Sequence, residues 1–175
     1  MKKATDILSG EHKQILKLID LLCVRCNELE KEVEIDKEFF QKVIIFIKDY
    51  ADKFHHLKEE DVLFVEFGKN LEDAHCDPTK QMLYEHEQGR NFVVGMEESL
   101  KEENKDKLIE NACNYAELLR DHIFKEDNIF YPMINEVISS DTQNKILSKF
   151  KQVEEKIGLK KRKELMNIIK ELGIE

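Results

Sequence analysis

The chain has 175 residues, of which 37 are acidic and 28 are Lys or Arg, giving a formal net charge of -9. Nucleic-acid affinity depends on basic patches that neutralise phosphates, so this charge disfavours a nucleic-acid partner. The length suits one domain with an appendage. A hydrophobic share of 41% is enough to build a core, and only 6 Gly and 2 Pro interrupt the chain. This scarcity favours long helices over a β-sandwich or barrel.

Apolar residues recur at helical spacing in four segments of the first 138 residues. The second segment begins at Asp36, a typical N-cap, and the third begins after Pro78, which suits the first turn of a helix. Pro132 is expected to kink or end the fourth. The segments cover about 5–31, 36–67, 79–101 and 105–131. Because their connections are short, we predict an all-α fold, an antiparallel up-down-up-down four-helix bundle over residues 1–138.

Residues 139–175 are predicted to form a C-terminal helical extension, with two shorter helices separated near Gly158. Their apolar positions need a surface to bury against. That surface is the bundle, a second copy of the chain in a homodimer, or a protein partner contacted through residues 141–175.

The sequence predicts a cytoplasmic protein that does not span a membrane. It contains no apolar run of about 18 residues, and its N-terminus lacks the apolar segment of a signal peptide. Four cysteines in a chain of this size do not make a disulfide scaffold. Cys23 and Cys26 fall on the apolar face of the first segment and are interpreted as small buried thiols.

Six ionisable side chains interrupt the apolar faces that should point into the bundle. Burying an unpaired polar group costs a few kcal/mol and burying a charge costs more, so these groups need a shared partner. Antiparallel pairing brings them to one level, because the sequence midpoint of each hairpin's two histidines falls within its connection. Glu59 and Glu126 follow one turn after His55 and His122 on the same face. The six are His12, His55, Glu59, His86, His122 and Glu126.

The two hairpins also repeat each other in sequence. E-H-x-Q occurs at Glu11 and again at Glu85, and H-x-x-K-E occurs at His55 and again at His122. The repeat predicts a pseudo-symmetric site with four imidazoles and two carboxylates. This ligand set suits Fe, Zn, Mn or Cu, and two central carboxylates can each bridge two ions. We therefore expect a dinuclear centre, with two non-haem iron ions bridged by oxo or hydroxo as the favoured cofactor.

The repeated H…H-x-x-x-E pattern, with E-H-x-Q at both leading histidines, resembles the hemerythrin-like, HHE cation-binding family. The resemblance covers about residues 5–135. It implies an antiparallel four-helix bundle holding a di-iron site. Activities associated with the family are reversible oxygen binding, nitric oxide or peroxide handling, iron or oxygen sensing, and repair of iron–sulfur clusters.

The sequence departs from the pattern of the oxygen-carrying hemerythrins on the third helix, where the resemblance implies an H-x-x-x-H pair. Met82 and Arg90 occupy the positions four residues either side of His86. One iron would thus have fewer protein ligands, which favours reaction with oxygen, peroxide or nitric oxide over simple oxygen carriage. The carriers have an acid five residues after the last histidine, so Asp127 competes with Glu126 as ligand, and the internal repeat favours Glu126.

The remaining candidates are weighed by the helix face on which they fall. His56 shares a face with charged residues and is expected to be solvated, and His75 is expected in a loop. Glu11 and Glu85 either hydrogen-bond to the ligands from outside or lie on the surface. Gly89 leaves space for a small ligand or serves helix packing.

The predicted function is a non-haem di-iron protein that binds or reacts with a small oxidant such as oxygen, peroxide or nitric oxide. One alternative is an iron, oxygen or redox sensor that signals through its C-terminal helices. A second is iron–sulfur cluster repair or iron donation.

Overall fold

The computed structural model describes residues 3–31 and 34–174, and its first helical hairpin has one arm made of a single α-helix and one composite arm. Asp36 starts the second arm by accepting a hydrogen bond from the Phe39 N–H at 3.0 Å. That arm then continues without a break through two π-helical stretches. The elements are α1 (Ala4–Leu29), α2 (Lys37–Phe46), η1 (Ile47–His56), η2 (Glu59–Leu63) and α3 (Phe64–Gly68).

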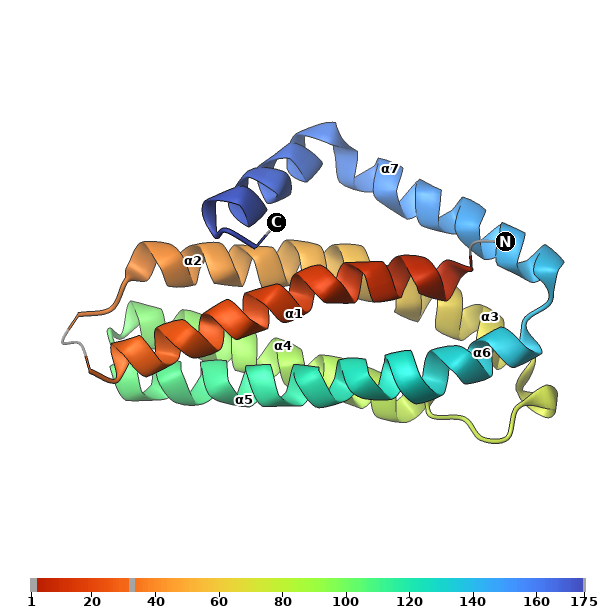
Figure 1. Cartoon of the computed structure of the whole chain (residues 1–175), viewed down its shortest axis with the longest axis horizontal. Helices are drawn as coiled ribbons and strands as arrows, with labels where there is room; N and C mark the ends of the chain where they lie inside the picture. The colour runs from red at the N-terminus through yellow and green to blue at the C-terminus, as the bar shows by residue number, and fades with distance from the viewer. Residues whose placement is uncertain (1–2, 32–33, 175) are drawn as a thin grey trace.

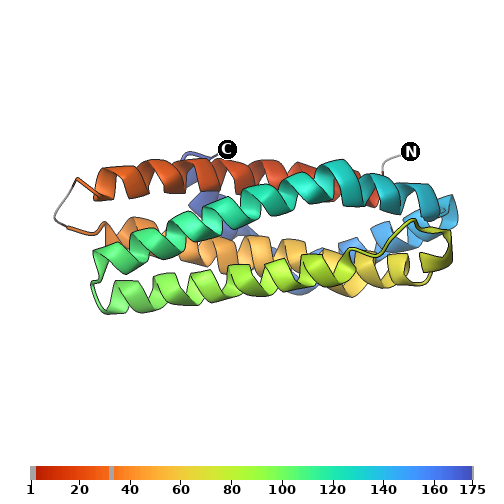
Figure 2. The same cartoon turned by 90° about the horizontal axis from the view of Figure 1, so that it is seen from below.

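The second hairpin follows a short 3₁₀ turn and repeats this pattern. Asn104 caps its second arm by accepting a hydrogen bond from the Lys107 N–H at 3.1 Å. The elements are η3 (Leu71–Asp73), α4 (Thr79–Lys101), α5 (Lys105–Lys125), the π-helical η4 (Glu126–Phe130) and α6 (Tyr131–Val137). The four arms run antiparallel side by side (Figures 1 and 2), which confirms the predicted all-α up-down-up-down bundle.

Pro132 does not end the fourth arm, which runs on to Val137. The proline lies in the first turn of α6, directly after η4, where the missing backbone N–H costs least. The other three long arms lie close to their predicted ranges.

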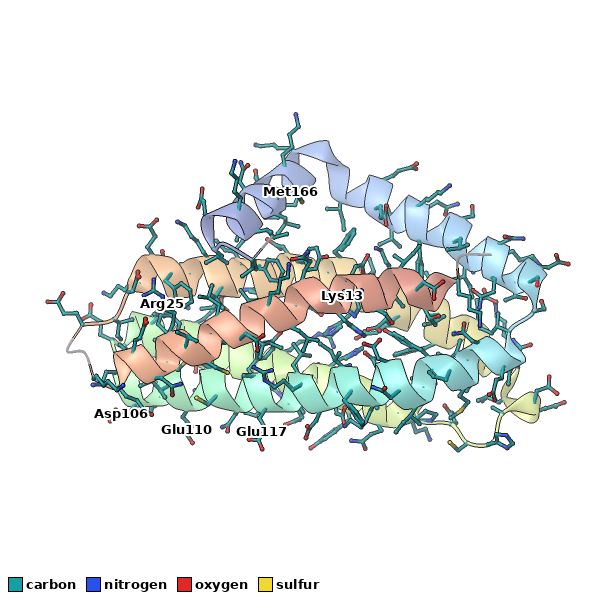
Figure 3. All side chains as sticks on the ribbon, viewed as in Figure 1. Lys13, Arg25, Asp106, Glu110, Glu117 and Met166 are labelled. Atoms are coloured by element: carbon teal, nitrogen blue, oxygen red, sulfur yellow. The ribbon has the colours of Figure 1, made fainter. Side chains whose placement is uncertain are left out.

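The bundle interior consists of two apolar clusters with a polar layer between them. The distal cluster, towards the two short connections, includes Ile19, Val43, Met96 and Leu108. The proximal cluster, towards the N-terminus, includes Leu8, Leu63, Met82 and Ile134. The outer face of α5 is charged and exposed, and Figure 3 shows its Asp106, Glu110 and Glu117 pointing away from the bundle.

The long helix α7 (Ser140–Glu171) packs on the bundle of its own chain and crosses the side formed by α1 and α2 (Figure 1). Ile146 and Phe150 of its first half join the proximal cluster, and Ile169 of its second half joins the distal cluster. Lys149 contacts Glu66 of α3 at 2.6 Å. Among the surfaces considered for the extension, the structure therefore uses the bundle. No helix in the described ranges is both long and apolar enough to cross a membrane.

Gly158 bends α7, with φ 78° and ψ 153°. This region of backbone space is open almost only to glycine. The bend lets both halves of α7 follow the bundle, whereas a straight helix would leave one half without a surface. Gly158 is not helical, so α7 consists of two helices that meet at a kink, as the sequence predicts.

We predict that Gly158→Ala weakens the docking of the second half of α7 by about 1–3 kcal/mol, the usual cost of such strain. A Cβ at Gly158 meets nothing within 4 Å, so the penalty comes from the backbone alone. Urea unfolding and limited proteolysis of residues 159–174 measure it. Gly10→Ala is the matched control, because its Cβ also meets open space and alanine favours the helix interior. Equal stability changes in the two variants would contradict the prediction.

Candidate metal centre

The polar layer between the two apolar clusters contains all six side chains that the sequence predicts to point inward. None is more than 2% exposed. They come from all four arms, and three of them lie in π-helical stretches. The placements are His12 on α1, His55 on η1, Glu59 on η2, His86 on α4, His122 on α5 and Glu126 on η4.

The four imidazoles form two pairs, one in each hairpin. The ring centroids of His12 and His55 are 4.6 Å apart. In the other hairpin, Nε2 of His86 and Nε2 of His122 are 3.0 Å apart. All four rings therefore direct Nε2 towards the middle of the layer.

Each carboxylate reaches both imidazole pairs. Glu59 places Oε1 3.5 Å from Nε2 of His55 and Oε2 3.5 Å from Nε2 of His86. Glu126 places Oε2 3.3 Å from Nε2 of both His12 and His122. The two carboxylates thus span the hairpins in the manner of bridging ligands.

The outer nitrogen of each of these histidines faces a carboxylate. Nδ1 of His55 is 3.0 Å from Glu11, and Nδ1 of His122 is 2.8 Å from Glu85. Such contacts fix the tautomer and the ring orientation, leaving Nε2 free to coordinate. Of the two readings of Glu11 and Glu85, the structure favours support of the ligands from outside.

Asp127 orients the ring of His12 in the same way, with its Oδ1 3.0 Å from Nδ1 of the histidine. Glu60 does the same for His86, at 2.7 Å. Asp127 is therefore directed at the outer nitrogen of His12, whereas Glu126 lies in the centre of the layer.

The surroundings follow the same twofold repeat as the ligands. Lys58 contacts Glu11, and Lys125 contacts Glu85. The ring of Tyr131 lies nearly parallel to that of His12 at 5.6 Å, and Phe64 occupies the equivalent place beside His86 at 6.1 Å. The sequence repeat is thus reproduced in space.

Burial shifts the pKa of every group in the layer towards the neutral form, but the charges of neighbouring groups outweigh this effect at several positions. Despite burial, Asp127 and Glu126 raise the pKa of His12 to about 9. Glu126 and Glu85 likewise raise the pKa of His122 to about 10. Burial would raise the pKa of Glu126, but the two histidines hold it well below its ordinary value. Burial and the charge of Glu126 together raise the pKa of Glu59.

The central carboxylate oxygens test whether the layer suits a metal. Within residues 3–31 and 34–174, Oε2 of Glu59 and both oxygens of Glu126 are buried without a hydrogen-bond partner. Leaving such acceptors unsatisfied costs about 1–3 kcal/mol each, and more for charged groups. A cation in contact with them removes this penalty, and imidazole with carboxylate is a donor set that Fe, Zn, Mn and Cu accept. The residues therefore fit a metal centre.

The prediction that His56 is solvated is wrong. The residue is 7% exposed, and its ring is stacked on that of His86 with centroids 3.7 Å apart. Burial and His86 lower the pKa of His56 to about 3, so the ring is neutral. The cause is η1: a π-turn holds more residues than an α-turn, so consecutive side chains diverge less. His75, by contrast, is exposed as expected.

Sequence reasoning also missed two buried residues that support the layer. Tyr131 donates a hydrogen bond from its hydroxyl to Oε1 of Glu59. Lys58 is fully buried and contacts both Glu11 and, at 3.1 Å, Glu154 of α7. The lysine of the repeated H-x-x-K-E motif was the available signal for Lys58. Nothing in the apolar pattern distinguishes Tyr131 from core.

A cavity of about 230 Å³ adjoins the polar layer on the side of the His86–His122 pair. His56 and His86 contribute to its wall, and Gly89 lines it without a side chain that would fill it. Apolar side chains supply much of the rest: Ile47, Val93, Val94, Tyr115 and Leu119. The space expected at Gly89 is therefore present beside the site.

Comparison with known protein families supports the same reading as the geometry. The family model described as the hemerythrin HHE cation binding domain matches residues 3–134. No curated protein and no solved structure gives a match. The match covers most of the chain and includes all six inward residues, and the chain therefore belongs to the hemerythrin HHE cation-binding family.

Proposed function

We propose that the chain is a non-haem di-iron protein that binds or reacts with a small oxidant, namely oxygen, peroxide or nitric oxide. The observation that carries the proposal is the contact of each central carboxylate with both imidazole pairs. A single tetrahedral ion has no use for six protein ligands, whereas two bridged ions use them all. His12 and His55 would hold one ion, His86 and His122 the other, and Glu59 and Glu126 would bridge them.

Iron bound there supplies the redox chemistry with the oxidant, and the protein's own residues prepare the site. Their near-complete burial keeps water from the ligand atoms. The outer carboxylates hold each Nε2 inward, and the Tyr131 hydroxyl fixes one oxygen of Glu59. Metal binding needs each ring to be neutral at Nε2, so the raised pKa values of His12 and His122 couple loading to the release of protons.

We also propose the cytoplasm as the location. All four cysteines are free, which suits a reducing compartment.

Anaerobic loading with Fe(II) tests the proposed function. We expect about two iron ions per chain, the number that the bridged ligand set accommodates. Exposure to oxygen should then produce oxo-to-iron charge-transfer bands in the ultraviolet-visible spectrum. His122→Ala should abolish these bands, whereas His75→Ala, which removes an exposed imidazole, should leave them intact. Fewer than about one iron per chain in the unaltered protein would refute the proposal.

Substitutions at Glu126 and Asp127 test which carboxylate is the ligand. Glu126→Gln should lower the iron stoichiometry, because it removes the group shared by His12 and His122. Asp127→Asn should keep the stoichiometry and weaken affinity by about 10- to 100-fold, the usual effect of altering a group that orients a ligand. Anaerobic Fe(II) titration measures both. The reverse pattern, with loss of iron only in Asp127→Asn, would overturn the assignment.

A second candidate function is a sensor that signals through the C-terminal helices, and one line of contacts favours it. Nδ1 of His55 faces Glu11, Glu11 contacts Lys58, and Lys58 contacts Glu154 of α7. The Lys58 ammonium also lies 3.6 Å from the ring centroid of Phe54. Any shift of His55 on metal binding or oxidation thus has a short, buried path to α7.

Lys58→Met and Lys125→Met form a matched pair for testing the sensor. Both remove a lysine from a glutamate that supports a ligand, but only Lys58 also contacts α7. We expect metal loading or oxidation to change the proteolysis rate of residues 141–174 in the unaltered protein and in Lys125→Met. Lys58→Met should lose that dependence. Identical cleavage of the unaltered protein in its apo, reduced and oxidised forms would exclude the sensor.

A further inference from the structure

His56 lies beside the six-residue layer but outside its twofold repeat. The repeat that relates His55 to His122 relates His56 to Ile123, an apolar residue that is 3% exposed. The same position of the repeat is therefore filled by an imidazole in the first hairpin and by an aliphatic side chain in the second. Packing alone does not require a second histidine after His55.

The ring of His56 brings a third nitrogen to the His86–His122 pair. It is stacked on His86 with an interplanar angle of 11° and lies edge-on to His122 with centroids 6.3 Å apart. One nitrogen from each of the three rings lies within 4.8 Å of the other two. The three nitrogens are close enough for one ion to reach them all once the His56 ring tilts out of its stack on His86, because parallel stacked rings do not aim their lone pairs at one point.

His56 is also supported in the same manner as the other inward histidines. Its Nδ1 faces Oδ1 of Asp52 at 3.4 Å, just as Nδ1 of His86 faces Glu60 at 2.7 Å. Arg90 joins the two supporting carboxylates, with Nη2 2.8 Å from Asp52 and 2.7 Å from Glu60. The two stacked rings are thus held by one clamp, which leaves the far nitrogen of each directed away from it.

We propose that His56 is a seventh protein ligand, which binds the ion held by His86 and His122. This inference rests on the proposed function and adds to it an unequal distribution of ligands. One ion would have three imidazoles and the other two, with Glu59 and Glu126 shared. The fifth histidine that the third helix lacks would come from the second arm of the first hairpin, where a π-turn brings two consecutive histidines to the layer.

The test is an anaerobic Co(II) titration of His56→Phe, followed by visible absorption. Phenylalanine keeps an aromatic ring against His86 but has no nitrogen, so it separates packing from coordination. We expect the unaltered protein and His75→Phe to bind two Co(II) ions. His56→Phe should bind one ion as before and the other at least about tenfold more weakly, because a direct ligand contributes no less than a supporting one.

The number of coordinated imidazoles gives a second readout, which a change in packing alone does not alter. In the Co(II)-loaded protein, each coordinated imidazole gives a paramagnetically shifted, exchangeable N–H proton signal. His56→Phe should have one such signal fewer than the unaltered protein. His56→Gln provides the same comparison with a smaller side chain should the phenylalanine variant fail to fold, as judged by its helical circular dichroism.

The outcomes separate the two claims. Wild-type Co(II) affinities and an unchanged number of shifted signals in a folded His56 variant would overturn the role of His56 and leave the di-metal centre standing. Failure of the unaltered protein to bind two Co(II) ions would overturn both.

Discussion

Four imidazoles and two carboxylates buried in one layer impose the main physical constraint on this bundle. Each group would lose favourable hydration on burial, and that loss is only partly offset by its neighbours. The structure answers with two sets of partners. Carboxylates face the outer nitrogens, and Lys58 and Lys125 in turn face Glu11 and Glu85. Within the described residues, Oε2 of Glu59 and both oxygens of Glu126 have no hydrogen-bond partner, so the layer is satisfied on its outside and unsatisfied at its centre.

The π-helical stretches solve a geometric problem that regular helices leave open. In an α-helix, residues four apart drift around the axis, so a long inward stripe leaves the core. Wider π-turns at η1, η2 and η4 counter that drift where the inward His and Glu side chains occur. They keep His55 and Glu59 on one side of the arm, and they also turn His56 inward. The same local departure therefore turns inward both the predicted site residues and His56, the proposed seventh ligand.

The fold and the six inward residues could be predicted because both follow from simple periodicity. Apolar spacing identifies the arms, short connections make them antiparallel, and the repeat of E-H-x-Q with H-x-x-K-E aligns the hairpins. The position of His56 could not be predicted, since helical projection assumes 100° per residue and η1 departs from it. The contacts of Tyr131 with Glu59 and of Lys58 with α7 join helices that are far apart in the sequence. No local sequence pattern predicts such contacts. Burial of α7 against its own bundle was one of three readings that the sequence left open.

The twofold likeness of the two hairpins is also broken beside the central carboxylates, by one hydroxyl group. Tyr131 and Phe64 hold equivalent places beside His12 and His86, but only Tyr131 has a hydroxyl to offer a central carboxylate. Glu59 consequently accepts a hydrogen bond from a hydroxyl, which neither oxygen of Glu126 does within the described residues. Negative charge that enters the layer therefore lies near this hydroxyl on the Glu59 side and not on the Glu126 side. The two sides of an almost symmetric site are thus electrostatically unequal.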